Sequence, residues 1–380
     1  MSYLFWRVVY VLIKPSCLLI AGRFISTDVA NLMAIIITIS AILMAALSFG
    51  TYRAYLNSGD EDRVRHGKHR ANSFVLNVIL VILVSIFLSA LFGDWMYFLI
   101  ITAVLLAEHL IHDESRVLLY SGLKVKWAKQ NAIRTFFLYA ALIMPAFISE
   151  LMMLISVLAI LGCLLLNSYA GTGLLSYFKE NNKIDYDFWT RYREGFQYFK
   201  SSLVNKFGQQ SDRVYFFVIA PESLWIYALL SQSASVMLTY FDVMHLAKFK
   251  SQLLSKKEFK FSYLSFRQSI ELFMIGFAVF IGVVVLGESN VLPEVSAEYL
   301  MLLLVLILGN FIVVTNTLNS ERLFWSIKNP KDFYMIEVKS FVVGLAIVIP
   351  VLTMPALVLV RLPFLLGCMF KIFKAKQCLK

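Results

Sequence analysis

The sequence predicts an all-α protein that crosses a membrane many times, and two observations support this fold class. The first is composition: of 380 residues, 59% are hydrophobic and 16% charged, with a mean hydropathy of +0.74. Soluble domains are about half apolar and about a quarter charged. The second is the recurrence of apolar stretches of roughly 20 residues, the length that crosses the hydrocarbon core of a bilayer.

Twelve stretches are apolar enough to be predicted as spanning helices. They cover residues 4–23, 29–49, 72–92, 95–112, 132–149, 151–170, 202–220, 223–243, 268–287, 298–317, 336–353 and 355–373. Short turns alternate with longer, basic connections, and an even number of spans returns the chain to its starting side. We expect the basic segments 124–130 and 186–199, which are also rich in aromatic residues, to lie along the membrane surface.

The net charge of +11 is explained by sidedness. In a soluble chain this charge would suggest a nucleic-acid partner, but most of the Lys and Arg residues fall in the long connections and at the termini. The positive-inside rule then places both termini and the long connections in the cytoplasm. The four cysteines (Cys17, Cys163, Cys368 and Cys378) have no paired spacing, so neither a disulfide framework nor a zinc site is expected.

A weak internal repeat relates the two halves of the chain. With a shift of 194 residues, the segment 25–34 aligns with 219–228, and Gly93 aligns with Gly287. We therefore predict an N-terminal six-helix bundle (1–175), a cytoplasmic connecting loop (176–200) and a C-terminal six-helix bundle (201–380), both in the same orientation. Transporters built from parallel repeats place their substrate site between the two halves.

The stretch NKFGQQSDRVYF (205–216) interrupts the apolar seventh span with polar residues. On a helix that turns about 100° per residue, the polar side chains fall within an arc of about 160°; they are Asn205, Lys206, Gln209, Gln210, Asp212 and Arg213. A charge inside a membrane costs about 2.5–3.5 kcal/mol, so such a face points into a bundle or a watery cavity. The alternative is structural: Asp212 neutralises Arg213 or Lys206 as an internal ion pair.

Other spans carry polar residues with similar alternatives. Lys14 either faces the cavity or extends to the interface, and Arg361 and Glu271 either line a pathway or form buried pairs. Three asparagines of the tenth span either line a path or bond to neighbouring helices: Asn310, Asn316 and Asn319. In the fourth span, Glu108, His109 and His112 share one face near the cytoplasmic end. A proton-coupling role suits them better than a metal site, and a helix end that simply reaches water is the alternative.

Cations exceed acids within the predicted spans. The cations are Lys14, Lys206, Arg213, Lys339 and Arg361, and the acids are Glu108, Asp212 and Glu271. A cationic cavity suits an anionic cargo that carries phosphate or carboxylate groups. A lipid-linked pyrophosphate sugar fits, because it combines an anionic head, a polar glycan and an apolar tail.

Three segments resemble a known family. They are LIKPSCLLIAGRFISTDVANLMAIIITISAILMAALSFG (12–50), SRVLLYSGLKVKWAKQNAIR (115–134) and SLVNKFGQQSDRVYFFVIAPESLWIYALLSQSASVM (202–237). They are similar to the first two spans, the stretch after the fourth span, and the seventh and eighth spans of the Wzx-like polysaccharide flippases. These flippases belong to the multidrug/oligosaccharidyl-lipid/polysaccharide (MOP) superfamily, and the motif match places Asp212 and Arg213 on the family's Asp-Arg pair.

The resemblance implies two six-helix bundles in a MOP/MATE-like arrangement, a cationic central cavity and alternating access. It also implies transfer of undecaprenyl-pyrophosphate-linked oligosaccharide units across the bacterial inner membrane, for O-antigen, capsule or exopolysaccharide assembly. The expected driving force is a proton or sodium gradient. No cofactor and no catalytic residue is expected, and the polysaccharide polymerase machinery is a further expected partner.

Two other functions are open from the sequence. A MATE-type exporter of small organic cations should have a cavity dominated by acids, whereas here the cations dominate. A membrane-bound polysaccharide polymerase or acyltransferase should carry a sizeable external loop or a set of reactive groups. The predicted external turns are short, and the long connections offer mainly basic and aromatic residues.

Overall fold

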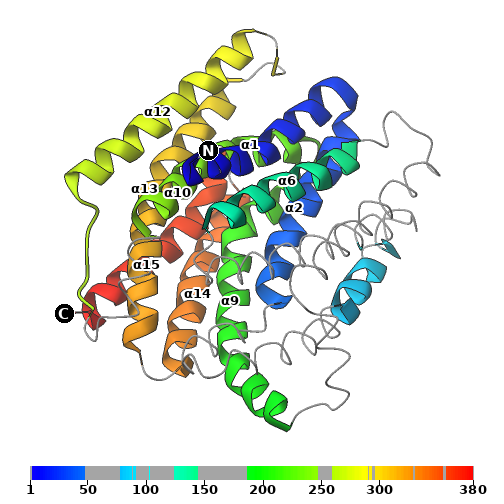
Figure 1. Ribbon diagram of the computed structural model, residues 1–380. Helices are drawn as coiled ribbons and strands as arrows, with labels where there is room; N and C mark the ends of the chain where they lie inside the picture. Colours follow the sequence, from blue (N-terminus) through cyan, green and yellow to red (C-terminus); the bar gives the residue numbers. More distant parts are fainter. Residues whose placement is uncertain are drawn as a thin grey trace. The chain divides into compact units, whose positions relative to one another are not determined.

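The computed structural model describes residues 2–47, 78–87, 89–90, 102, 124–143, 186–246, 259–289, 291–292, 296–327, 330–353 and 357–379. Every element of secondary structure in these ranges is helical (Figure 1). The chain divides into two compact units, which are described separately below. The first comprises Met1–Ile13 and Ile35–Leu203, and the second comprises Lys14–Ala34 and Val204–Lys380.

Four of the described helices are long and apolar enough to cross a membrane. They are Tyr3–Ile25, Pro221–Phe241, Phe266–Glu288 and Ala297–Phe324. The prediction of an all-helical chain with apolar helices of membrane length is therefore confirmed for this part of the chain. The count of twelve spans, the repeat and the division into two bundles stay predictions. The expected span 151–170 lies outside the described residues, and so does 95–112 apart from residue 102.

The first unit contains the start of α1 (Tyr3–Ile20), most of α2 (Thr27–Leu47) and α6 (Lys124–Ile143). Arg7 of α1 is buried, and its guanidinium carbon lies 4.5 Å from the ring centroid of Trp127 in α6. A cation over a tryptophan face is favourable, more so when it is shielded from water. The contact therefore joins α1 to the start of α6.

The segment 124–130, expected to be a loop along the membrane surface, is helical instead; its position relative to the membrane stays a prediction. The reason for the helix is a buried stripe with helical spacing along α6: Ala128, Ala132, Thr135 and Tyr139 are all buried. Residues three and four positions apart share a helix face, so the basic residues of this segment occupy the other side of a regular helix. The basic and aromatic composition of the segment suggested a loop, whereas the spacing of its small residues indicates a helix.

The segment 186–199 is also helical, because α9 runs continuously over Tyr186–Ile219. No proline occurs within these 34 residues to interrupt the helix, and Pro221 follows directly after its end. At 1.5 Å per residue, α9 is about 51 Å long, well beyond the roughly 30 Å of a hydrocarbon core. The expected surface segment is thus the first part of the helix that carries the polar face.

The second unit is a helical bundle around α13. Its helices are α10 (Leu224–Phe241), α12 (Phe266–Glu288), α13 (Ala297–Ser326), α14 (Pro330–Thr353) and α15 (Leu362–Cys378), together with the end of α9 and the segment Lys14–Ala34. α13 packs against α10, α12 and α15, and α14 packs against α15. Apolar side chains of α13 and α15 form one core cluster of Val313, Phe364, Leu365 and Cys368.

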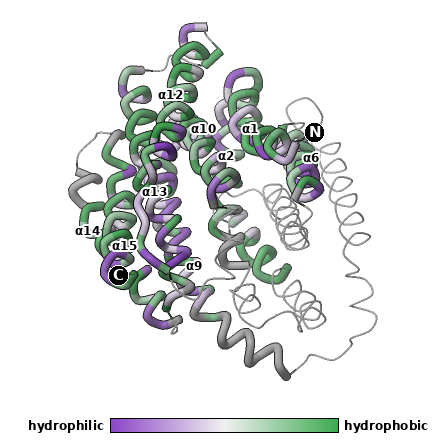
Figure 2. Tube along the Cα trace, turned by 60° about the vertical axis from the view of Figure 1, so that its left-hand side comes forward, coloured by the Kyte–Doolittle hydropathy of each residue, from purple (hydrophilic) through white to green (hydrophobic). Residues whose placement is uncertain are grey.

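The outer face of α12 is apolar along its length. Phe266, Ile270, Phe273, Phe277 and Ile281 are all exposed at spacings of three or four residues. Figure 2 shows α12 as a largely hydrophobic helix. In water, such a stripe would be a large exposed apolar patch, so we assign it to lipid.

Two glycines let α14 and α15 approach each other closely. A Cβ atom added at Gly344 would lie 2.6 Å from the carbonyl oxygen of Pro363, and one at Gly367 would lie 3.0 Å from the carbonyl oxygen of Ser340. Backbone atoms cannot move aside as a flexible side chain does. Close contact between membrane helices through small residues is a common source of their association.

We expect Gly344→Ala to destabilise the protein by about 1–3 kcal/mol, the usual cost of overpacking a well-packed site. Thermal unfolding of the purified protein in detergent measures this effect. The matched control is Gly282→Ala in α12, where an added Cβ would meet nothing within 4 Å. Equal melting temperatures for the two variants would contradict the close approach of α14 and α15 at Gly344.

Candidate functional site: two buried polar clusters on α9

The first cluster surrounds Asp212 in the middle of α9. Its carboxylate is only 1% exposed. Oδ2 accepts hydrogen bonds from the Tyr227 hydroxyl of α10 and from the Arg361 guanidinium, which lies directly before α15, while Oδ1 accepts the backbone N–H of Arg213. The buried carboxylate is thus both neutralised and hydrogen-bonded, as a charge taken out of water must be.

Arg361 and Tyr227 are themselves held in place. Arg361 also donates to the carbonyl oxygen of Gln209 at 3.2 Å, and its guanidinium carbon lies 4.4 Å from the ring centroid of Phe364. The ring of Tyr227 stacks on Phe216 with centroids 4.2 Å apart. The Asp212 cluster therefore ties α9 to α10 and to the start of α15. It also identifies Arg361 as an ion-pair partner of Asp212, one of the two alternatives for Arg361.

Two further cations lie beside this cluster on α9. Arg213 is buried, and its Nη2 donates to the Ser231 hydroxyl of α10 at 3.3 Å. Lys206 donates to the side-chain oxygen of Gln209 at 2.8 Å. The amide oxygen of Gln210 is buried, with no hydrogen-bond partner in the described part of the chain. A buried polar atom of this kind calls for a partner, and a bound water or ligand supplies one.

The second cluster joins three helices around an ion pair. Glu337 of α14 is 3% exposed, and its carboxylate lies 2.5 Å from the ammonium group of Lys371 in α15. Lys371 also donates to the side-chain oxygen of Asn205 in α9 at 2.9 Å. A small cavity of about 30 Å³ adjoins this cluster. Its polar and small lining residues include Ser211, Ser340, Gly344, Gly367 and Cys368, and this volume is enough for a water molecule.

Sequence reasoning missed Glu337 and Lys371, because each lies near the cytoplasmic end of a predicted span. The helical spacing of small and polar residues around them is the sequence signal that could have identified both residues. Glu337, Ser340 and Gly344 share one face of α14, and Gly367 and Lys371 share one face of α15. Lys339, which was expected among the cavity cations, is exposed on α14 instead.

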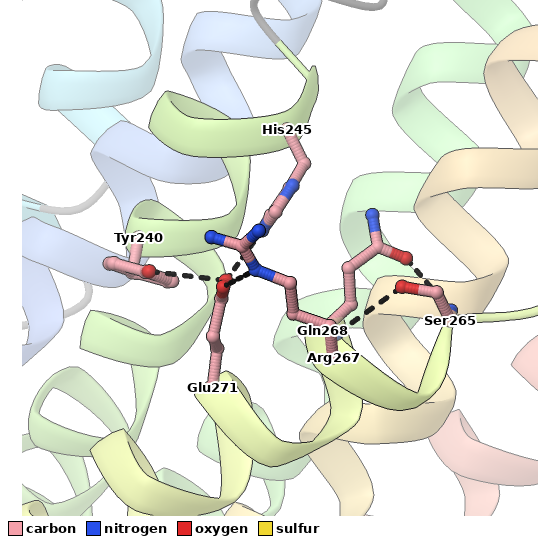
Figure 3. A network of polar contacts seen from close by, with 6 residues as sticks. All are labelled: Tyr240, His245, Ser265, Arg267, Gln268 and Glu271. Carbon is pink, nitrogen blue, oxygen red and sulfur yellow. Dashed lines mark hydrogen bonds and ion pairs between the residues drawn. The ribbon is translucent and has the colours of Figure 1, made fainter.

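Glu271 belongs to a different cluster, at the junction of α10 and α12. It accepts from Arg267 at 2.9 Å and from the Tyr240 hydroxyl at 3.2 Å, and it lies 2.9 Å from Nε2 of His245 (Figure 3). His245 lies in the π-helical turn Asp242–Leu246 that follows α10. Glu271 is therefore ion-paired, but the pair is not the buried one of the two alternatives, since the Arg267 side chain is 88% exposed and that of Glu271 22%; a pathway role stays a prediction.

The remaining predicted residues fall into three groups. The asparagines of α13 bond to neighbouring segments: Asn310 to the Ala234 carbonyl, Asn316 to Cys368 and Asn319 to the Ser262 carbonyl. Lys14 is half-buried in α1, directly before the buried Pro15. Glu108, His109 and His112 lie outside the described residues.

The π-helical turn Ala21–Ile25 and the start of α2 meet the start of α10. The side-chain oxygen of Asn31 accepts the backbone N–H of Trp225 at 3.0 Å. A Cβ added at Gly22 would lie 2.5 Å from the Trp225 ring, so only glycine fits beneath it. Positions 31 and 225 are 194 residues apart, which is the shift of the predicted repeat.

Comparisons with known proteins leave the family open. No protein-family model and no curated protein matches the chain. A solved structure, described as the inward-facing conformation of a multidrug resistance MATE family transporter of the MOP superfamily, is 12% identical with a TM-score of 0.47. The alignment covers 98% of this chain and 93% of that one. At this degree of likeness, membership of the superfamily stays a prediction; the described helices define an all-helical chain with membrane-length spans.

Proposed function

We propose that the protein is a flippase of the bacterial inner membrane. Its cargo is an undecaprenyl-pyrophosphate-linked oligosaccharide repeat unit for O-antigen, capsule or exopolysaccharide assembly. The head of the cargo crosses between two six-helix bundles that open alternately to either side, while the polyprenyl tail stays in the bilayer. This step moves the cargo and forms no covalent bond, so it needs no catalytic residue.

The excess of cations around α9 is the observation that carries the proposal. Within the described part of the chain, the two clusters and their neighbours hold four cations (Lys206, Arg213, Arg361 and Lys371) and two carboxylates (Asp212 and Glu337). Asp212 pairs with Arg361 and Glu337 pairs with Lys371, so cationic side chains outnumber carboxylates among these described groups. A buried excess of this sign favours an anionic group such as a pyrophosphate.

The two kinds of polar residue have different roles in this proposal. Arg361 and Lys371 hold α9 to its neighbours through Asp212 and Glu337, which fixes the direction of the polar face. Lys206 and Arg213 bind the pyrophosphate, and Arg213 suits a planar two-point contact with phosphate oxygens. Gln209 and Gln210 offer amide groups for the sugar hydroxyls, and Lys14 adds a further cation from α1.

A proton or sodium gradient is the proposed driving force. Glu271 with its partner His245 is one candidate for the coupling group, since histidine changes charge near neutral pH. Glu108, His109 and His112 are the other candidates. A MATE-type exporter of organic cations is the second candidate function. The cationic excess disfavours it, because a buried positive site repels such a cargo.

The proposal is tested by replacing Arg213, Lys206 and Lys14 with alanine, singly, in a strain deleted for this gene. We expect loss of surface glycan at normal protein abundance, with lipid-linked repeat units accumulating in the cytoplasmic leaflet. Lys339→Ala is the matched control, because this cation is exposed on α14 and lies outside both clusters. Normal glycan from all three variants would refute the cationic-cavity mechanism.

A further inference from the structure

An extended segment, residues 259–265, crosses the ends of α13 and α15 before α12 begins; we call it the strap. Figure 1 shows it running from beside the C-terminus to the start of α12. Its backbone is bonded to both helices: the N–H of Phe261 donates to the Leu379 carbonyl at 3.0 Å, and the N–H of Ser262 donates to the Asn319 side chain at 3.1 Å. Arg322 donates to the Lys260 carbonyl at 2.8 Å. These hydrogen bonds hold the backbone of the strap against the ends of α13 and α15.

The strap lies at the level where the hydrocarbon of the membrane ends. Phe266, the first residue of α12, is 83% exposed and begins the apolar outer stripe of that helix. A phenylalanine so exposed is placed against lipid rather than water. Tyr263, three residues earlier, is 62% exposed, and tyrosine prefers the headgroup region, where its ring and hydroxyl meet different surroundings.

Cations surround these two aromatic residues. Lys260 and Lys376 are exposed, and the side chain of Arg267 is 88% exposed. The ammonium group of Lys376 lies 5.7 Å from the ring centroid of Tyr263. The interaction with Tyr263 raises the pKa of Lys376 above its usual value, which favours the charged form of this lysine. Lys260 and Lys376 thus present cations from the strap and from the last turn of α15, whereas the guanidinium of Arg267 is bonded to Glu271 and directed toward His245 (Figure 3).

A hydrogen-bond network joins the strap to the body of the unit. The hydroxyl of Ser265 accepts the backbone N–H of Gln268, and the Gln268 side chain accepts the N–H of Ser265, which closes a capping box at the start of α12 (Figure 3). One turn later, Glu271 holds Arg267 and His245. The first turn of α12 is therefore rigid, and its exposed groups keep their positions.

We propose that the strap, the first turn of α12 and the last turn of α15 form a binding site for an anionic phospholipid. The phosphate of the lipid is bound by Lys260 and Lys376, and its acyl chains lie along the stripe that begins at Phe266. A phospholipid meets both requirements, because it carries the anionic group and the apolar chain in one molecule. By the positive-inside prediction, this site faces the cytoplasmic leaflet.

The test measures how much phosphatidylglycerol, relative to phosphatidylcholine, stays bound to the purified full chain in native mass spectrometry. The double variant Lys260→Gln/Lys376→Gln is expected to lose about 25-fold in preference, at roughly fivefold for each cation near an anionic surface. Lys339→Gln, which removes an exposed cation elsewhere, is expected to leave the preference unchanged. Unchanged preference in the double variant, or equal loss in the control, would overturn the proposal.

Two further measurements separate the acyl chain from the phosphate. Phe266→Ser is expected to weaken retention of both lipids alike, because it removes an apolar contact and no charge. Inorganic phosphate at millimolar concentration is expected not to displace phosphatidylglycerol. Displacement by phosphate alone would show a simple anion site and would overturn the phospholipid assignment.

Discussion

Replacing Asp212 with alanine is expected to lower the stability of the protein by about 3–5 kcal/mol, because it strands a buried cation without its counter-charge. Asp212 is 1% exposed, and the side chain of its partner Arg361 is 11% exposed. The Tyr227 hydroxyl also loses its acceptor. The apparent melting temperature of the protein in detergent measures the loss, and the variant is expected to accumulate poorly in membranes.

The double variant Asp212→Leu/Arg361→Met is the informative control. An apolar pair of similar size often matches or exceeds the stability of a buried ion pair, since no charge has to be desolvated. We therefore expect the double variant to recover most of the stability lost in Asp212→Ala. A double variant as unstable as Asp212→Ala would mean that the pair itself, and not the stranded charge, stabilises the bundle.

Cross-linking the start of α2 to the start of α10 is expected to abolish the proposed transport. Asn31 bonds to the backbone of Trp225, and the Trp225 ring covers Gly22. If the proposed two-bundle alternating access holds, this contact opens once in each cycle, on the side predicted to lie opposite the basic connections. A disulfide between Asn31→Cys and Trp225→Cys, formed with an oxidant in cells, should stop surface glycan export, and a reductant should restore it.

The single-cysteine variants are the controls for this experiment. Each is expected to export glycan under oxidising and reducing conditions alike, provided that its substitution alone is tolerated. Mobility of the protein on a denaturing gel reports whether the cross-link forms. Full export by protein that is fully cross-linked would show that the contact between Asn31 and Trp225 does not have to open.

The polar face of α9 could be predicted from the sequence, because helical periodicity is a local property. An arc of about 160° is visible from the residue spacing alone. The partners on that face could not be predicted, because they come from far along the chain. Arg361 lies 149 residues from Asp212, and Lys371 lies 166 residues from Asn205. Their pairing depends on how α15 packs against α9, which no local pattern specifies.

For two segments that mix basic and aromatic residues, the local structure predicted from composition was wrong. Lys, Trp and Tyr residues in 124–130 and 186–199 suggested surface loops, whereas both segments begin helices. Charged residues are good helix formers, and their presence does not end a helix unless a proline or a cap follows. The spacing of the alanines at positions 128 and 132, which are both buried in the structure, was the better signal for a helix.

In the proposed alternating access, the cations on the polar face of α9 would also make transport sensitive to the membrane potential. Among the described residues, Lys206 and Arg213 lie on this face, beside the ion pairs of Asp212 with Arg361 and of Glu337 with Lys371. Moving one charge across a potential of 100 mV changes the energy by about 2.3 kcal/mol, as large as many conformational differences. On the proposed mechanism we therefore expect the potential to favour the arrangement in which these cations lie closer to the negative side, so that voltage as well as cargo sets the rate of export.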